Sequence, residues 1–247
     1  MQDVEQPVSL KLMPLSYHKE LLISCRELSV RYEGAESDTL KNLTFELMHG
    51  ERVFLHGENG CGKSTLLKII NGIIKPDVGT IEIGQTIKIG YFSQENEYMD
   101  ESERVIDYVK EAGEYIATSD GKITASQMLE RFLFDGAMQW SRIEKLSGGE
   151  KRRLYLLRVL MEAPNVLILD EPTNDLDIQT LTILEDYLDH FDGIILIVSH
   201  DRYFLDRTVS RIFAFNGGGK IRQSEGGYSD YLIRVELEKP KDGQTIA

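Results

Sequence analysis

The hydrophobic positions in the second half of the chain alternate between helix-like and strand-like segments. Two short, continuously apolar runs at 166–170 and 194–199 follow segments with helical spacing at 148–162 and 178–190, respectively. Apolar strands joined by helices are typical of a parallel sheet that is covered on both faces. The pattern therefore predicts an α/β fold with a mostly parallel core sheet.

Strand-like segments dominate the first third of the chain. Strand periodicity covers 21–32, 39–48 and 52–56, and residues 80–84 and 88–92 alternate like the two strands of a hairpin. We therefore predict an antiparallel β subdomain beside the parallel sheet.

Three further elements complete the predicted domain. Residues 64–71 follow the third strand as a helix, 211–223 contain two short strands around a Gly-Gly-Gly turn, and 228–238 begin like a helix. The alternation of strands and helices therefore extends to both sides of the central region.

An acidic stretch interrupts this pattern. Residues 95–120 hold nine Asp or Glu side chains against Arg104 and Lys110, which is typical of a solvated face. Together with 124–140, this stretch predicts a mostly helical insertion, within a helical subdomain at about 95–160.

The two ends of the chain differ from the region between them. Residues 1–20 lack a clear period and contain two prolines, which indicates a tail or the remnant of a linker. Residues 233–247 are interpreted as a polar C-terminal tail. One domain is therefore predicted over 21–232.

Composition narrows the class of protein. The 247 residues include 28 Lys or Arg and 41 Asp or Glu, a net charge of −13, which argues against a surface that binds a phosphate backbone throughout. Cys25 and Cys61 lack metal-ligand spacing and fit a reducing compartment. No apolar run approaches the ~18 residues of a membrane helix, and the first residues lack a signal pattern. We expect a soluble, cytoplasmic chain with no transmembrane segment of its own, although a membrane partner stays open.

Residues 57–64, GENGCGKS, form the first chemical motif. The sequence fits G-x-x-x-x-G-K-[ST] between a predicted strand and a predicted helix. Glycines allow successive N–H groups to face phosphate oxygens, Lys63 reaches the β- and γ-phosphates, and the Ser64 hydroxyl is a Mg²⁺ ligand. The predicted nucleotide-binding residues here are Gly57, Asn59, Gly60, Cys61, Gly62, Lys63, Ser64 and Thr65.

Two adjacent acids end the buried run at 166–170. Asp170 is in the position of a carboxylate that supports Mg²⁺ in P-loop proteins. Glu171 projects in another direction, where a carboxylate can orient and deprotonate a water. The alternative is that one of the two merely caps the turn that follows.

The segment 146–150, LSGGE, begins the helix before these acids. Gly148 and Gly149 lower helix stability in a first turn, so close approach of an anion to the bare N–H groups explains them better. The alternative is a capping box formed by Ser147 and Glu150.

Two sets of residues follow in the same helix. Three consecutive basic residues are interpreted as a solvated cluster with a nucleic-acid contact left open, and an apolar set at helical spacing is expected in the core. The basic residues are Lys151, Arg152 and Arg153, and the apolar residues are Leu154, Leu157, Leu160 and Met161.

The order of these motifs resembles that of the ATP-binding cassette ATPases. A P-loop, LSGGE, LILDEP and a histidine after a strand occur in that order within residues 21–232. The resemblance implies a P-loop fold of the cassette type, with ATP and Mg²⁺ as cofactors. It also implies that LSGGE of one cassette contacts ATP held by a second cassette, head to tail, through Ser147, Gly148, Gly149 and Glu150.

The same resemblance assigns the remaining site residues. Gln94 is similar to the glutamine near Mg²⁺ and the attacking water, His200 to the histidine that touches the γ-phosphate, and Tyr32 to the aromatic residue that stacks on adenine. Glu171, His200 and Gln94 form the implied catalytic set, and Ser64, Gln94 and Asp170 the implied metal set. The loop implied to cross the interface contains Asn174, Asp175 and Asp177.

The amino-acid sequences of two segments resemble those of one family of cassettes in particular. EPTNDLD at 171–177 and SHDRYFLD at 199–206 are similar to ABC-F proteins, and 157–188 to their Uup-like subgroup. This implies two cassettes on one parent chain joined by a linker that reaches the ribosome. With one cassette in 247 residues, we interpret the chain as an excised C-terminal cassette. The alternatives are the ATPase subunit of a membrane transporter and a DNA-linked cassette.

Overall fold

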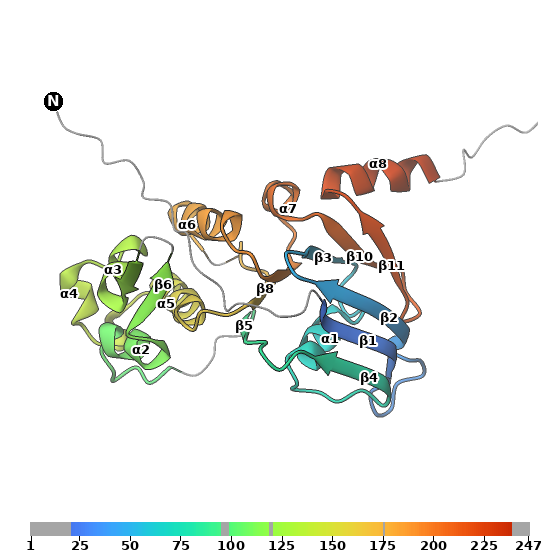
Figure 1. Ribbon diagram of the computed structural model, residues 1–247, viewed down its shortest axis with the longest axis horizontal. Helices are drawn as coiled ribbons and strands as arrows, with labels where there is room; N and C mark the ends of the chain where they lie inside the picture. The colour runs from blue at the N-terminus through green and yellow to red at the C-terminus, as the bar shows by residue number, and fades with distance from the viewer. Residues whose placement is uncertain (1–20, 95–98, 119–120, 175, 239–247) are drawn as a thin grey trace, which may run out of the picture.

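A six-stranded sheet forms the centre of the structure (Figure 1). The computed structural model describes residues 21–94, 99–118, 121–174 and 176–238. The strand order is β11-β10-β3-β9-β8-β5, and every neighbouring pair is parallel except β10 and β11. The strands are β3 (Arg52–His56), β5 (Ile89–Phe92), β8 (Val166–Asp170), β9 (Ile194–Val198), β10 (Arg211–Phe215) and β11 (Ile221–Glu225). The predicted mostly parallel core sheet is confirmed.

A separate antiparallel sheet lies beside the core sheet. Its order is β2-β1-β4, built from β1 (Leu21–Val30), β2 (Leu40–Met48) and β4 (Val78–Ile83). This sheet is the predicted antiparallel β subdomain.

The hairpin predicted between 80–84 and 88–92 is wrong. Strand β4 pairs with β1, whereas β5 pairs with β8 in parallel. The buried amide of Asn165, next to β8, binds the turn between β4 and β5: its Oδ1 accepts the N–H of Lys88 at 2.7 Å and its Nδ2 donates to the carbonyl of Thr86 at 2.7 Å. Alternation along a strand predicts its faces but not its partner.

The insertion is helical with one small sheet. Figure 1 shows it on the opposite side of the molecule from the antiparallel sheet. Helices α2 (Val105–Ala112), α3 (Ala125–Arg131) and α4 (Gly136–Gln139) surround a hairpin of β6 (Tyr115–Thr118) and β7 (Gly121–Thr124). A 3₁₀ turn, Ile143–Lys145, leads to the next helix. The hairpin was not predicted, since its strands are only four residues long.

Five further helices belong to the region around the core sheet. They are α1 (Lys63–Ile70), α5 (Gly148–Met161), α6 (Ile178–Asp189), α7 (Arg202–Thr208) and α8 (Tyr228–Glu238). The boundary predicted at residue 232 falls inside α8, and the tail predicted over 1–20 lies outside the described residues. Within the described ranges, no helix has the length and apolarity needed to cross a bilayer.

Strand β8 separates two hydrophobic cores. All five of its residues are buried, and alternate residues face opposite sides. Leu167 and Leu169 pack in one core with α5, and Val166 and Ile168 pack in the other with α1. The apolar residues predicted for the core of α5, Leu154, Leu157, Leu160 and Met161, are all at most 2% exposed.

The turn before β9 generates a stability prediction. A Cβ atom on Gly193 would lie 2.2 Å from the carbonyl oxygen of buried Asn165 and 2.7 Å from a ring carbon of Phe191. We expect Gly193→Ala to lower the free energy of unfolding by about 1–3 kcal/mol, because neither neighbour has room to move. Urea denaturation measures the change.

Gly136→Ala serves as the control, because a Cβ atom there meets nothing within 4 Å. Equal stability of the Gly193→Ala protein and the wild type would contradict the predicted close packing at this turn.

Candidate functional site

One cavity collects most of the residues predicted to bind nucleotide. It lies at the carboxyl ends of β3, β9 and β8, adjacent strands of the core sheet, and has a volume of about 620 Å³. Its lining contains Tyr32, Thr39, Asn59, Gly60, Gly62, Lys63, Ser64, Thr65, Gln94, Asp170, Glu171, Asn174, Val198 and His200. Parallel pairing is the reason, since it brings the ends of separate strands to one edge.

The loop from β3 to α1 forms one wall of the cavity. Gly62 has φ 109°, in the left-handed region, and a Cβ there would lie 2.8 Å from Leu40 Cδ2 and 3.0 Å from the carbonyl oxygen of Thr39. Gly57 and Cys61 are not lining residues. They shape the loop from behind, where a Cβ on Gly57 would lie 2.7 Å from Cys61 Sγ.

Lys63 places a positive charge inside this loop. Its side chain is buried, and its Nζ donates to the carbonyl oxygens of Gly57 at 2.6 Å and Glu58 at 2.8 Å. A buried ammonium held by backbone carbonyls is a directed cation at the first turn of α1. The loop and Lys63 therefore form an electropositive wall suited to phosphate.

Asp170, the last residue of β8, lines the same cavity. Burial raises the pKa of this carboxyl above its usual value, and a hydrogen bond from the Tyr91 hydroxyl to Oδ2, at 3.3 Å, acts in the opposite direction. A carboxylate in this place gains from a nearby cation, because a cation offsets the desolvation that burial imposes.

Glu171 is held in an unusual backbone conformation. Its φ is 52°, in the left-handed region, while its N–H donates to the carbonyl oxygen of Val198 at 2.8 Å. This conformation costs about 1–3 kcal/mol in a non-glycine residue. The backbone bond to β9 fixes the turn in which Glu171 follows Asp170.

His200 and Glu171 face each other across the ends of β8 and β9. His200 Nε2 lies 3.1 Å from Glu171 Oε1, with the histidine side chain 71% exposed and the glutamate 8% exposed. Burial raises the pKa of Glu171, and the charge of His200 opposes that shift. Within the described residues, Glu171 Oε2 is buried without a hydrogen-bond partner. A buried, unpaired acceptor of this kind suits a water or a substrate hydroxyl.

The donor set for a metal consists of oxygen atoms. Ser64, Gln94 and Asp170 line the same cavity and supply a hydroxyl, an amide and a carboxylate oxygen. Over the described part of the chain, no three His, Cys, Asp or Glu side chains gather as a metal site. Hard oxygen donors fit Mg²⁺ rather than a metal held by nitrogen and sulfur.

Tyr32 and two residues not predicted from the sequence complete the lining. The Tyr32 hydroxyl is 3.1 Å from Thr65 Oγ1, and 46% of the residue is exposed beside the loop. Thr39 and Val198 were missed because neither carries a distinctive chemistry. The tight approach of the Thr39 carbonyl to Gly62 is visible only in three dimensions.

The LSGGE segment lies outside this cavity, at the start of α5. Ser147 Oγ accepts the N–H of Glu150, and Glu150 Oε2 accepts the N–H of Ser147 at 2.7 Å, so the capping box is present. The hydrogen bonds that the Glu150 carboxylate accepts from the N–H and the hydroxyl of Ser147 lower its pKa. A Cβ atom on Gly148 or Gly149 meets nothing within 4 Å. The capping box of Ser147 and Glu150 therefore forms while the space around Gly148 and Gly149 stays open.

The basic residues after LSGGE are not the solvated cluster that we predicted. Arg152 is 2% exposed and lies over the ring of Phe92 at 3.9 Å, and Arg153 is 8% exposed with Nη1 3.1 Å from Asp177 Oδ2. Flat guanidinium groups pack on aromatic faces, which allows their burial. Lys151 pairs with Glu101 on the surface.

The residues of the predicted interface loop differ in what they contact. Asn174 lines the cavity, and Asp177 caps α6 through the N–H of Thr180 at 2.8 Å. Asp175 lies outside the described residues.

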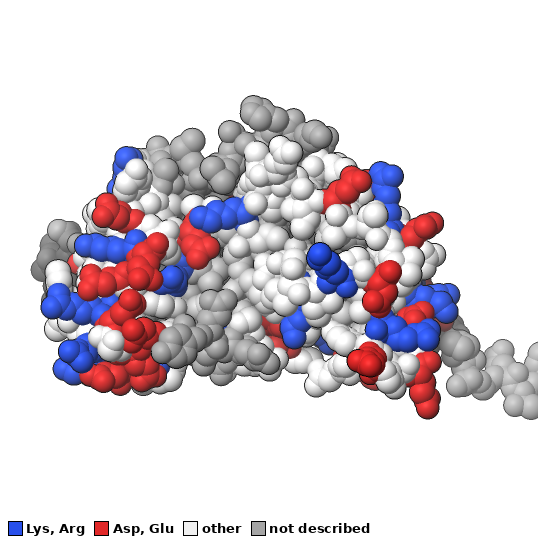
Figure 2. Space-filling model, turned by 90° about the horizontal axis from the view of Figure 1, so that it is seen from below, with Lys and Arg blue, Asp and Glu red and all other residues white. Residues whose placement is uncertain are grey.

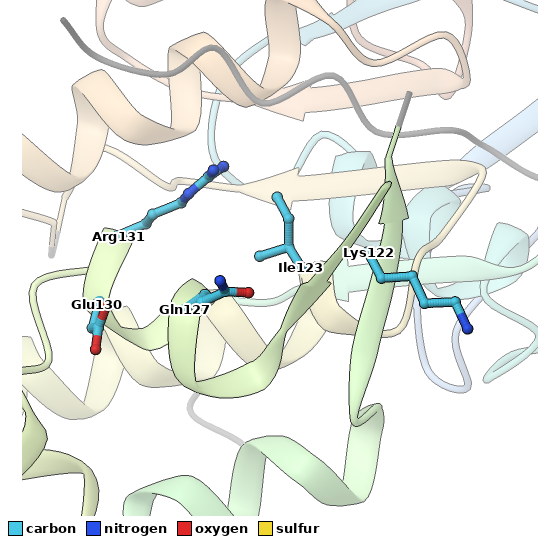
Figure 3. A pocket seen from close by; sticks show the side chains of 5 residues that line it. All are labelled: Lys122, Ile123, Gln127, Glu130 and Arg131. Atoms are coloured by element: carbon cyan, nitrogen blue, oxygen red, sulfur yellow. The ribbon is translucent and has the colours of Figure 1, made fainter. Parts of the chain in front are cut away.

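A second hollow lies in the helical subdomain between the β6–β7 hairpin and α3 (Figure 3). It has a volume of about 390 Å³ and is lined by Lys122, Ile123, Gln127, Glu130 and Arg131. Figure 3 shows the side chains of Lys122 and Arg131 extending away from each other. The two cationic groups therefore do not converge on one ligand, and none of the predicted site residues lies here.

Comparisons with known proteins agree with this geometry. A family model described as ABC transporter matches residues 40–174, more than half of the chain. The protein described as "Uncharacterized ABC transporter ATP-binding protein YfmR" of Bacillus subtilis (strain 168) is 57% identical over 77% of this chain and 30% of its own length.

Two relatives of Escherichia coli (strain K12) are more distant. ATP-binding protein Uup is 39% identical over 81% of this chain and 32% of its own length, and "Energy-dependent translational throttle protein EttA" is 40% identical over 78% and 35%. The chain thus spans about a third of the length of these relatives.

Solved structures show the same fold at low sequence identity. An ATP-binding subunit of an ABC transporter has a TM-score of 0.70 at 22% identity, covering 88% of this chain and 95% of that one. The dimeric cassette MJ0796, in a post-hydrolysis state bound to ADP and Pi, has a TM-score of 0.65 at 21% identity, covering 83% and 98%. From the cavity, the family model and these relatives together, we conclude that the chain belongs to the ATP-binding cassette family and has the P-loop fold of that family.

Proposed function

We propose that this cassette is of the ABC-F type and closes head to tail on a second cassette, with ATP between them, in association with the ribosome. The observation that carries the ATP-site part of this proposal is the single cavity in which Lys63, Asp170 and Glu171 meet. The exposed LSGGE helix start outside the cavity supports the second half, because it offers bare N–H groups to an anion on another molecule.

Each wall of the cavity has its own role in this proposal. The loop amides and Lys63 bind the phosphates, and the exposed ring of Tyr32 receives the adenine base. Ser64, Gln94 and Asp170 would hold Mg²⁺, which when bound neutralises charge on the phosphates. The two acidic side chains therefore divide the work, Asp170 toward the metal and Glu171 toward water.

Glu171 acts as the general base in this proposal. Its Oε1 faces His200 at 3.1 Å, and its Oε2 is the buried acceptor that has no partner within the described residues. Oε2 can orient a water and take its proton. The raised pKa of Glu171 favours this role, because a more basic carboxylate accepts a proton more readily. His200 holds the carboxylate in place and, with its exposed ring, reaches the γ-phosphate.

Closure and opening would follow the state of one phosphate. A γ-phosphate docked on LSGGE of the second cassette links the two bodies, and hydrolysis removes that link. The second cassette is either another copy of this chain or another domain of the same protein. We further propose that this is the C-terminal cassette of a longer, Uup-like protein. That proposal is consistent with relatives of which the matched segment is only about a third.

Two observations bear on the choice between a translation factor and a transporter subunit. The segments EPTNDLD and SHDRYFLD, together with the similarity to a relative described as a translational throttle protein, favour the ABC-F reading. The description of YfmR as a transporter ATP-binding protein, and the similar fold of a transporter subunit, support the alternative.

Surface charge bears on the nucleic-acid alternatives. Figure 2 shows Lys and Arg side chains interspersed with Asp and Glu over the helical subdomain, without a continuous basic area on that face. A DNA-linked role is therefore not favoured by this face. Ribosome binding would rely on a linker rather than on this surface.

The first prediction about the site concerns Lys63 and the loop from β3 to α1, which form its electropositive wall. We expect Lys63→Ala to weaken ATP binding about 10- to 100-fold, because charge-assisted hydrogen bonds contribute about 1.5–3 kcal/mol. Equilibrium binding of a fluorescent ATP analogue measures the loss. Lys75→Ala, at an exposed lysine beyond α1, is the control, and equal affinity in both variants would remove Lys63 from the site.

The second prediction separates binding from chemistry. Glu171→Gln keeps the size of the side chain but cannot take a proton, so we expect ATP affinity within about twofold of wild type and turnover reduced about 100-fold or more. Phosphate release and nucleotide binding are measured on the same preparation. Exposed Glu236 supplies the control, Glu236→Gln. Wild-type turnover in Glu171→Gln would exclude the base role.

The third prediction tests the docking of LSGGE. In the Glu171→Gln background, Ser147→Arg should block ATP-driven dimerisation and leave ATP binding by the monomer intact, because the bulky cation occupies the helix start. Light scattering after gel filtration gives the mass. Ser210→Arg, at an exposed position before β10, is the control, and melting temperatures check for the lost helix cap. Dimers of the Ser147→Arg protein would contradict the proposal.

The ribosome is tested by co-sedimentation of the full-length protein carrying Glu171→Gln, in Mg-ATP and in ADP. Pelleting with ribosomes in Mg-ATP alone is the expected result. A closed, ATP-bound protein that stays in the supernatant would instead favour the transporter alternative.

A further inference from the structure

Tyr91 connects the end of β5 to the acid at the end of β8. The two strands are parallel neighbours, with Tyr91 opposite Ile168. The Tyr91 hydroxyl donates a hydrogen bond to Asp170 Oδ2 at 3.3 Å. Asp170 is 6% exposed, so few water molecules compete for that oxygen. The rotation of the carboxylate is therefore restrained from a neighbouring strand.

Tyr91 is in turn held by helix α5. The hydroxyl of Tyr155, a residue 2% exposed, donates to the carbonyl oxygen of Tyr91 at 2.9 Å. The ring of Tyr155 stacks on the ring of Phe92 with centroids 5.4 Å apart, and the guanidinium group of Arg152 lies 3.9 Å from the centroid of the Phe92 ring. Two side chains of α5, those of Tyr155 and Arg152, thus contact the last two residues of β5.

The contacts between α5 and the end of β5 lie close to two segments with proposed roles in ATP binding, the LSGGE segment and Gln94. Helix α5 begins with the LSGGE segment, and Gln94, a predicted metal ligand, follows Phe92 by two residues. Residues 152 and 155 are one to two helical turns from the exposed start of α5. The helix that presents LSGGE therefore also holds the strand whose tyrosine restrains Asp170.

We propose that Tyr91 is a positioning residue for Asp170, that its hydroxyl orients this carboxylate for Mg²⁺, and that Tyr155 keeps Tyr91 in place. This rests on the proposed role of Asp170 as a metal-supporting carboxylate. Partners that orient a ligating carboxylate typically change metal affinity 10- to 100-fold when removed. A tyrosine that only fills space would affect stability but not the metal dependence.

The test is the Mg²⁺ dependence of nucleotide affinity in Tyr91→Phe. A fluorescent ATP analogue is titrated in EDTA and over a series of Mg²⁺ concentrations. We expect affinity in EDTA within about twofold of wild type and a Mg²⁺ requirement about tenfold higher. In turnover assays, the same variant should show a raised KM for Mg²⁺ with kcat restored at saturating metal.

Further variants make the result specific. Tyr155→Phe keeps the Tyr91 hydroxyl and releases its backbone, so a smaller shift in the same direction is expected. Tyr115→Phe removes one hydroxyl from a half-exposed residue of β6 and should leave the Mg²⁺ dependence unchanged. Melting temperatures identify any general loss of folding.

The outcomes also separate this inference from the function on which it rests. A shift in Asp170→Asn without a shift in Tyr91→Phe would overturn the positioning role and leave Asp170 as a metal-supporting residue. An unchanged Mg²⁺ dependence in Asp170→Asn itself would overturn the metal role of Asp170, and the positioning role with it. An unchanged Mg²⁺ dependence in Tyr155→Phe would overturn the part of the proposal that concerns helix α5.

Discussion

Parallel pairing of β3, β9 and β8 is the constraint on which the site depends. Register places Phe54 opposite Ile197 and Asp170 opposite Val198, so all three strands end at one edge of the sheet. Residues more than a hundred positions apart in the chain therefore meet in one cavity. Each strand is apolar, because it is covered by side chains on both faces. The polar groups of the site consequently lie at the last residue of a strand, as Asp170 does, or in the loops that follow the strands.

Much of this arrangement could be predicted from the sequence, because period and motif both carry it. The buried runs at 166–170 and 194–199 predicted the core strands, and the glycine spacing around Lys63 predicted the loop. Strand pairing was less accessible. The partner of β5 is β8, which lies far along the chain, and no local pattern in residues 80–92 records that pairing or the hydrogen bonds from Asn165 to the turn before β5.

Charge was the second source of error, for a different physical reason. Three consecutive basic residues after LSGGE predicted a solvated cluster, but Arg152 and Arg153 are buried against Phe92 and Phe134. A guanidinium group is weakly hydrated and flat, so it packs on an aromatic face, and Arg153 also pairs with the carboxylate of Asp177. Residue type alone does not separate this arrangement from a solvated one, since it depends on rings contributed by other segments.

The left-handed backbone of Glu171 has a consequence for how this position varies. Glycine adopts φ near 52° without the steric penalty that a side chain carries. Replacement of Glu171 by glycine would therefore relieve local strain while removing a carboxylate. Selection for stability alone would favour that loss, as expected where function and stability oppose each other. A glutamate maintained at this turn over generations would thus report selection for its chemistry, and a lineage in which ATP is bound but no longer cleaved would be free to lose it.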